Sequence, residues 1–403
     1  MLMNIKAEGI KMGNRMACAV LTVILLFSGC TLFNPPTPEE GIQPISTFYF
    51  DGWETFGKDI KQTPDGGFIV VGFIESYPNR NTLLMKLDAF GSITWQKQYE
   101  LTYNTLAVEC RPEGGYVLAG LDYSDNMYFI MKVDADGNSQ EIKKIGNQIR
   151  EFKGIIRISD GYIIYGSGGN KGAMAKFDSD GNSLWAINLS DFYNSRLHET
   201  RIMTDGSYLA SGTVYSLSSY PDYLFLSKVT AEGVILWTRY YNVLDTDTDC
   251  HDAAEIGSGS GYIAAVDLLS MEMDHSRFAV LKFNSNGDFE RELRMGGGYP
   301  FSAATQIMPS AGNFIVGGGM APMGEDIQYA YVTKINSNLE TLWSVKMKGD
   351  SPRHSGETRG NYIIKMCATS DGGVAFTGYC AEVSDSNREI FVARLRANGL
   401  RMW

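Results

Sequence analysis

The chain has 403 residues, is 44% hydrophobic with 44 glycines, and carries a formal net charge of −11. This composition is sufficient for a packed core joined by many tight turns. A chain this acidic lacks the positive surface that grips phosphate backbones, which argues against nucleic acid as a partner.

Residues 1–29 are expected to be an export signal. An apolar run at residues 16–27 follows a basic N-terminal stretch. The run is shorter than the about 20 residues needed to span a bilayer, but it has the length of a signal-peptide core. The basic residues are Lys6, Lys11 and Arg15.

The end of this signal, Ser28-Gly29-Cys30, resembles the lipobox of bacterial lipoproteins. The resemblance implies that Cys30 becomes the lipidated N-terminus and anchors the protein in the cell envelope. Thr31 stands where retention in the inner membrane prefers Asp, which favours the outer membrane or cell surface. An ordinary secretory signal with an incidental cysteine is the alternative.

Residues 30–44 are expected to form a Pro-rich, extended tether, and residues 45–403 the folded domain. The cysteines of this domain show no spacing typical of a metal or redox motif. Cys110 and Cys367 lie in apolar, strand-like runs and are interpreted as buried single thiols.

Two short motifs recur seven times in the folded domain. One is an Asp-Gly-Gly hairpin followed by aromatic and β-branched residues, as in residues 65–72. The other is a basic residue, a turn and a tryptophan nine positions later, as in Lys86 to Trp95. Four short antiparallel strands per copy, without helical periodicity, predict an all-β, seven-bladed β-propeller. A β-solenoid is the alternative, disfavoured because solenoid coils are shorter and parallel.

The turn and its tryptophan resemble the tryptophan-docking repeat of quinoprotein-type propellers. The resemblance implies that each tryptophan packs against the neighbouring blade. Glu141 and Arg291 replace the tryptophan in copies two and five, where we expect poorer packing. The five tryptophans are Trp95, Trp185, Trp237, Trp343 and Trp403.

The two ends of the domain are expected to close the ring together. The last copy stops at Trp403, one residue into the strand that continues in other copies. An apolar strand at residues 46–50 precedes the first hairpin and belongs to none of the seven copies. We therefore expect an N-terminal strand to join the last blade and remove an open sheet edge.

The variable segments predict one binding face. The hairpin turns are short and uniform, whereas the second-to-third loops and the blade crossings vary, and binding residues usually occupy such loops. His198 with Glu199, and His251 with Asp252, take the same place in consecutive copies. We expect them to line the mouth of the central channel. His354, in the corresponding crossing into blade 7, is predicted to line the same site. Arg196 and Arg201 are predicted to contact an anion there.

The crossing at residues 245–252 has the densest group of candidate metal ligands. Alternating carboxylates at Asp245, Asp247 and Asp249 would suit a hard cation such as calcium. The segment lacks the central Gly and terminal Glu of an EF-hand loop, so a solvated acidic loop is the competing interpretation. No other cofactor is predicted.

These features predict a non-catalytic binding or scaffolding propeller, monomeric and lipid-anchored, with an envelope protein or glycan as partner. Propeller lipoproteins that assist outer-membrane protein assembly are one resembling class. The alternative is a polysaccharide-active hydrolase or lyase, or another envelope enzyme, with its site at the mouth of the central channel. The chain has no adjacent cysteines and no G-x-S-x-G, H-E-x-x-H or Walker motif to support a known enzyme class.

Overall fold

The computed structural model describes residues 42–403 with gaps, so the predicted signal and Cys30 lie outside the described residues. No helix in the described part is long and apolar enough to span a membrane. The gaps are residues 46, 49–53, 77–78, 100–102, 123–124, 126, 147–148, 150, 217–220, 244–245, 271–275, 296–300, 322–326, 350–359 and 382–387.

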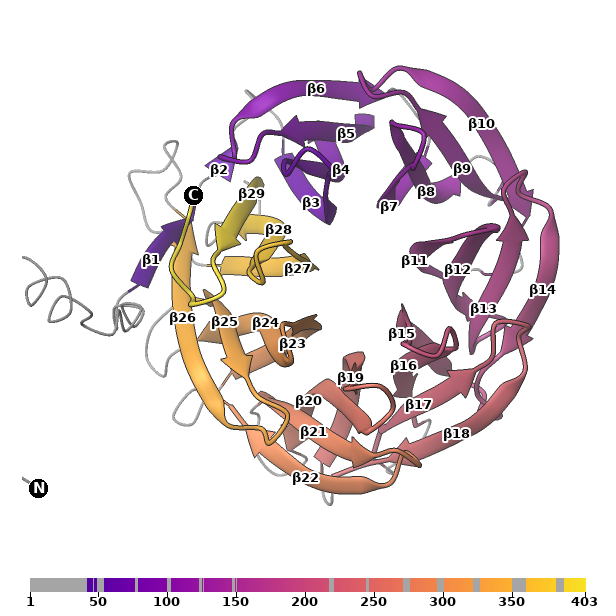
Figure 1. Cartoon of the computed structure of the whole chain (residues 1–403), viewed down its shortest axis with the longest axis vertical. Helices are drawn as coiled ribbons and strands as arrows, with labels where there is room; N and C mark the ends of the chain where they lie inside the picture. Colours follow the sequence, from indigo (N-terminus) through magenta and orange to yellow (C-terminus); the bar gives the residue numbers. More distant parts are fainter. Residues whose placement is uncertain are drawn as a thin grey trace, which may run out of the picture. The chain divides into compact units, whose positions relative to one another are not determined.

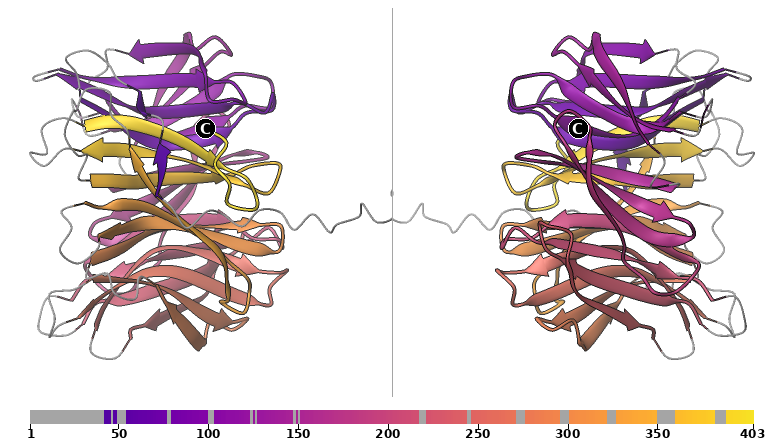
Figure 2. Two further views of the ribbon diagram at one scale, coloured as in Figure 1. Left: turned by 90° about the vertical axis from the view of Figure 1, so that its left-hand side faces the viewer. Right: turned by 90° about the vertical axis from the view of Figure 1, so that its right-hand side faces the viewer.

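Seven antiparallel blades surround a central axis, which confirms the predicted propeller (Figure 1). The first strand of each blade lies next to the axis, and the fourth strand lies at the rim. Because successive strands are antiparallel, the Asp-Gly hairpins and the tryptophan turns share one face of the ring (Figure 2). Blades 5 and 6 are also joined by one parallel bridge, between Ser276 and Phe301.

The strands follow the sequence repeats in order. Blade 1 contains β3 (Glu54–Gln62), β4 (Phe68–Ser76), β5 (Asn79–Leu87) and β6 (Ile93–Tyr99); blade 2 contains β7 (Tyr103–Cys110), β8 (Tyr116–Asp122), β9 (Met127–Val133) and β10 (Ser139–Gly146). Blade 3 contains β11 (Glu151–Ile158), β12 (Gly161–Gly168), β13 (Lys171–Asp178) and β14 (Ser183–Asn188); blade 4 contains β15 (Ser195–Ile202), β16 (Tyr208–Val214), β17 (Tyr223–Val229) and β18 (Ile235–Tyr241). Blade 5 contains β19 (Thr246–Ile256), β20 (Gly261–Ser270), β21 (Ser276–Asn284) and β22 (Phe289–Arg294); blade 6 contains β23 (Phe301–Ser310), β24 (Asn313–Ala321), β25 (Tyr329–Ile335) and β26 (Thr341–Gly349). Blade 7 contains β27 (Gly360–Ala368), β28 (Val374–Ala381) and β29 (Arg388–Leu395).

Both ends of the domain complete blade 7, as predicted. Strand β2 (Thr47–Phe48) pairs antiparallel with β29. The Arg394 amide donates a hydrogen bond of 3.2 Å to the Trp403 carbonyl, so the last residues run beside the same strand. Strand β1 (Ile42–Ile45) pairs in parallel with β26, on the rim of blade 6. The predicted tether therefore overlaps a strand that belongs to the propeller.

Each of the five tryptophans lies on the fourth strand of its blade, or in its place, and contacts the next blade. Trp95 faces the turn of blade 2, where a Cβ added at Gly137 would lie 2.8 Å from the indole. Trp403 faces the turn of blade 1, and its Nε1 donates a 3.1 Å hydrogen bond to the Ala89 carbonyl. All five side chains are half-buried. Glycine in the turn therefore permits both the positive φ and the close approach of the ring.

In four copies the recurring basic residue links the two motifs. Lys86 lies 2.8 Å from the hairpin residue Asp65, and the same pair forms in blades 3, 4 and 7. In blade 2, which lacks the tryptophan, Lys132 instead pairs with Glu141 at 3.0 Å. The ion pair gives the recurring basic residue a structural role.

Packing at the tryptophan-free blade 5 differs from the expectation. In the turn of blade 6 that follows it, Leu339 replaces glycine at a φ of 61°. Its side chain is 2% exposed and packs in one apolar cluster with Met295 and Ile335. The contact between blades 5 and 6 has no indole, and the Leu339 side chain fills space there. This contact is therefore well packed.

Candidate functional site

Every innermost strand carries a β-bulge at the same register. Each bulge inserts one extra residue before the segment that faces the channel. The extra residues are Lys58, Leu106, Lys153, His198, His251, Thr305 and Ile364. The residues that follow them are Asp59, Ala107, Gly154, Glu199, Asp252, Gln306 and Lys365. We call these seven following positions the post-bulge ring.

A cavity of about 350 Å³ lies among the innermost strands. Strands of six blades line it. Six of the seven residues of the post-bulge ring belong to its wall, and Asp252 is the one that does not. The volume is at the lower end of the range for pockets that hold small molecules. The site is therefore an axial cavity with a charged wall.

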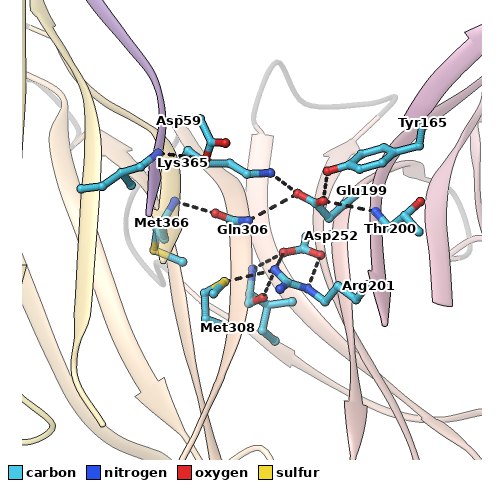
Figure 3. A network of polar contacts seen from close by, with 12 residues as sticks. Asp59, Tyr165, Glu199, Thr200, Arg201, Asp252, Gln306, Met308, Lys365 and Met366 are labelled. Atoms are coloured by element: carbon cyan, nitrogen blue, oxygen red, sulfur yellow. Dashed lines mark hydrogen bonds and ion pairs between the residues drawn. The ribbon is translucent and has the colours of Figure 1, made fainter. Parts of the chain in front are cut away.

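Glu199 is the centre of one polar network in this cavity (Figure 3). Its carboxylate is ion-paired with Lys365 and accepts a hydrogen bond from the Tyr165 hydroxyl. Gln306 donates a third bond of 3.3 Å from its amide nitrogen. Burial alone would raise the pKa of Glu199, but Lys365 and Arg201 outweigh it and lower this pKa to about 2. Glu199 is thus ionised at neutral pH.

Arg201 and Asp252 form a second, bidentate pair (Figure 3). The two nitrogens of Arg201 lie 3.0 and 2.5 Å from the two carboxylate oxygens of Asp252. The guanidinium also donates a 2.7 Å hydrogen bond to the Ile307 carbonyl. Asp252 is fully buried, and burial raises its pKa despite the neighbouring guanidinium. Arg201 is consequently the neutralising partner of a carboxylate that water does not reach.

Most polar members of the post-bulge ring connect adjacent blades. Asp59 accepts the Val108 amide at 3.0 Å, and Asp252 accepts the Ile307 amide at 2.9 Å. Gln306 accepts the next amide around the ring, at 2.6 Å. Glu199 departs from this pattern, because its carboxylate joins Lys365 of blade 7 rather than an amide of blade 5. Besides its bond to Tyr165 of the adjacent blade 3, Glu199 therefore connects blade 4 with blade 7 across the channel.

The structure brings His198 and His251 together, with ring centroids 6.0 Å apart. His251 Nε2 lies 2.8 Å from an Asp267 oxygen, and this carboxylate outweighs burial and raises the pKa of His251. Burial lowers the pKa of His198 to about 3. The predicted partners Glu199, Arg201 and Asp252 belong to the channel networks described above.

Two other predicted site residues, Arg196 and His354, do not belong to these networks as described. Arg196 is exposed, pairs with Glu151 at 3.3 Å and lies over the Tyr215 ring. His354 lies outside the described residues. Its predicted place in the site stays a prediction.

The candidate calcium segment is not a crossing loop, because β19 begins at Thr246. Asp247 accepts the Asp222 amide at 2.9 Å, and Asp249 accepts the Thr213 hydroxyl at 2.5 Å. These carboxylates join β19 to blade 4. Within the described ranges no three His, Cys, Asp or Glu side chains are grouped to hold a metal, and Asp245 falls outside those ranges. Calcium binding stays a prediction.

Sequence reasoning missed most of the charged cavity wall: Lys58, Asp59, Lys61, Glu109, Lys153 and Lys365. A signal was present for two of them. His198 precedes its hairpin acid Asp205 by seven residues, and Lys58 and Lys153 hold the same offset from their own hairpin acids. Comparing all copies at this offset would have identified both lysines.

No protein-family model matches this sequence, and no curated protein matches it. Among solved structures, Sqt1 from Chaetomium thermophilum, bound to the N-terminus of a ribosomal protein, is 12% identical with a TM-score of 0.52, over 87% of this chain and 99% of that one. The β-propeller domain of the Trilobed protease from Pyrococcus furiosus is 10% identical with a TM-score of 0.50, over 85% and 95%. The likeness is one of fold alone.

Lowering the pH from 8 to 5 should destabilise the wild-type protein about 2 kcal/mol more than a His198→Gln variant. The unfolded chain protonates this histidine near its ordinary pKa, whereas in the folded protein its pKa is about 3. Stability is therefore lost as the pH falls below that ordinary value. The raised pKa of His251 acts in the opposite direction in both proteins. Urea unfolding at both pH values measures the difference, and parallel pH profiles would contradict it.

Proposed function

We propose that the protein is a non-catalytic binding propeller of the cell envelope, anchored through Cys30, whose ligand occupies the axial cavity. The observation that carries this proposal is the composition of the cavity wall. Six blades supply it, and its central carboxylate, Glu199, pairs with Lys365 of blade 7 across the channel. A rigid scaffold with side chains directed into an enclosed space is typical of binding sites.

The state of the carboxylates favours binding over hydrolysis. Glycoside hydrolysis uses two carboxyl groups that must both be available to the substrate. In this cavity Glu199 is paired with Lys365, Glu109 lies 2.8 Å from Lys61, and Asp59 accepts the Val108 amide. Asp252, behind the wall, is paired with Arg201. The carboxylates of these networks are thus engaged in holding the wall together.

An envelope protein or a glycan remains the expected partner class. Sqt1, which shares the fold, holds the N-terminus of another protein. An axial cavity of about 350 Å³ also has room for a chain end or a short polymer segment. This supports a ligand that inserts one end along the axis rather than one that covers a flat face.

Filling the cavity tests this proposal. Ile156 lines the cavity and is half-buried, so Ile156→Trp should occupy the lumen. Its matched control is Ile142→Trp, on the outer strand of blade 2, where the side chain is 42% exposed. Calorimetric titration with purified envelope glycans and with unstructured peptides should show binding that Ile156→Trp abolishes and Ile142→Trp retains. Equal binding by both variants, or turnover of a glycan by the wild type, would overturn the proposal.

The anchor is tested separately. Cys30→Ala should leave unprocessed precursor and remove the protein from the membrane fraction, because the lipobox cysteine is the acylated residue. Globomycin should cause the same accumulation of wild-type precursor, seen by immunoblotting of cell fractions. Normal processing with release of the variant would favour the ordinary secretory signal instead.

A further inference from the structure

The cavity wall carries more positive than negative charge. Five cationic residues line it, against three carboxylates. The cations are Lys58, Lys61, Lys153, Arg201 and Lys365, and the carboxylates are Asp59, Glu109 and Glu199. The whole chain has a net charge of −11, so a positive cavity is a local exception. Such an exception concentrates anions at the site.

Three of these cations are neutralised by close partners. Lys61 lies 2.8 Å from Glu109, Lys365 pairs with Glu199, and Arg201 pairs with Asp252. Within the described residues, Lys58 and Lys153 form no ion pair with an acidic side chain. Asp59, the remaining carboxylate of the wall, lies 3.9 Å from Lys61 and accepts the Val108 amide. Lys58 and Lys153 are thus the described cations of the wall that have no acidic partner.

The groups near Lys58 are other cations and an aromatic ring. Its ammonium lies 5.3 Å from the centroid of Phe73, and the Arg80 guanidinium lies over the same ring. Burial and then Arg80, Lys153 and Arg388 lower the pKa of Lys58. A charged group with such neighbours gains more than a surface lysine from an anion placed beside it.

Lys153 lines the same cavity. Glu151 and Asp249 attract it from a distance, but burial and Arg196 prevail and lower its pKa. Both acids are already engaged, Glu151 with Arg196 and Asp249 with the Thr213 hydroxyl. Lys153 and Lys58 occupy the same bulge position two blades apart.

We propose that Lys58 and Lys153 bind an oxyanion, a carboxylate or a phosphate, carried by the ligand of the axial cavity. The inference rests on the proposed function and names the chemical class of its ligand. Lysine ammonium groups are point charges that bind either oxyanion without demanding one orientation. The cavity admits a small anionic molecule or the anionic end of a polymer.

Calorimetric titration with citrate and with pyrophosphate distinguishes the two oxyanions. Lys58→Met and Lys153→Met should each weaken binding of the preferred probe about tenfold, because each removes one charge-assisted contact. The matched control is Lys97→Met on the outer strand of blade 1, which should bind as the wild type does. Binding should also weaken as the pH rises, as the lysines lose their protons.

Trace acetylation followed by mass spectrometry gives a readout that does not depend on affinity. With their lowered pKa values, Lys58 and Lys153 should be acetylated faster than Lys97 at pH 7.5, and the bound probe should protect both. Undiminished binding in the Lys58→Met/Lys153→Met protein, together with unprotected lysines, would overturn the inference. Failure of both probes to bind the wild type at millimolar concentration would do the same.

The two proposals fail differently. A neutral glycan that binds the wild type, is excluded by Ile156→Trp and is unaffected by the lysine variants would overturn only the oxyanion site. Turnover of an anionic polymer, with the two lysines still protected, would overturn the non-catalytic function and leave the oxyanion site standing.

Discussion

Replacing Arg201 with methionine should lower the free energy of unfolding by about 3–5 kcal/mol, the cost of leaving a buried charge without its partner. Asp252 is fully buried, and Arg201 is the cation that contacts both of its oxygens. Methionine keeps much of the apolar contact with the channel wall but removes the guanidinium. Urea unfolding at pH 7, followed by tryptophan fluorescence, measures the loss.

Two further variants separate charge from packing. Arg196→Met breaks an exposed pair with Glu151 and should cost about 0–1 kcal/mol. Adding Asp252→Asn to Arg201→Met removes the orphaned charge, while the side-chain oxygen still accepts the Ile307 amide. This double variant should recover part of the stability. A double variant as unstable as the single one would show that packing, and not charge, dominates at this site.

Trp403→Ala should be the second most damaging single change, with a loss of about 3 kcal/mol, the lower end of the range for deleting a large aromatic side chain. The ring packs edge-on against Phe68 at 5.4 Å, and its Nε1 bonds the Ala89 carbonyl. These contacts join the last blade to the first. Their loss weakens the closure of the ring as well as one interface.

Trp237→Ala provides the comparison, because Trp237 makes the equivalent contact with Tyr262, between blades 4 and 5. This internal interface is also held by the continuous chain. Chemical unfolding of both variants should show the larger loss in free energy of unfolding for Trp403→Ala. The slope of this free energy against denaturant concentration should also be smaller for Trp403→Ala. Equal losses would mean that closure adds nothing beyond the local contact.

The fold was predictable because its determinants are local and repeated. The glycine of the tryptophan turn must take a positive φ, and the tryptophan lies at a fixed distance from it in sequence, as at Gly91 and Trp95. Four copies carry both residues at this spacing, each of the other three keeps one of them, and the copies together reinforce one another. The partner of the indole is always the next blade, so a repeated motif was sufficient to predict the ring.

The cavity was only partly predictable, for two physical reasons. The bulge shifts which residues face the channel, and nothing in residues 57–59 marks Lys58 as the extra one. The networks also join distant segments, as when Glu199 meets Lys365. The histidines attracted notice because the chain has only 4 of them, whereas two lysines among 35 basic residues did not.

The post-bulge ring has a consequence for how such a protein acquires new specificity. One chain here holds acidic, basic, amide and side-chain-free residues at a single structural position, while the flanking strands keep the same ladder. Ala107 and Gly154 show that the connection between blades does not require a polar side chain there. Substitution at a lining position that makes no bond to the next blade, as at Ala107, therefore alters what the lumen recognises and leaves the blades intact. Evolution and protein engineering can both vary such positions on a fixed frame.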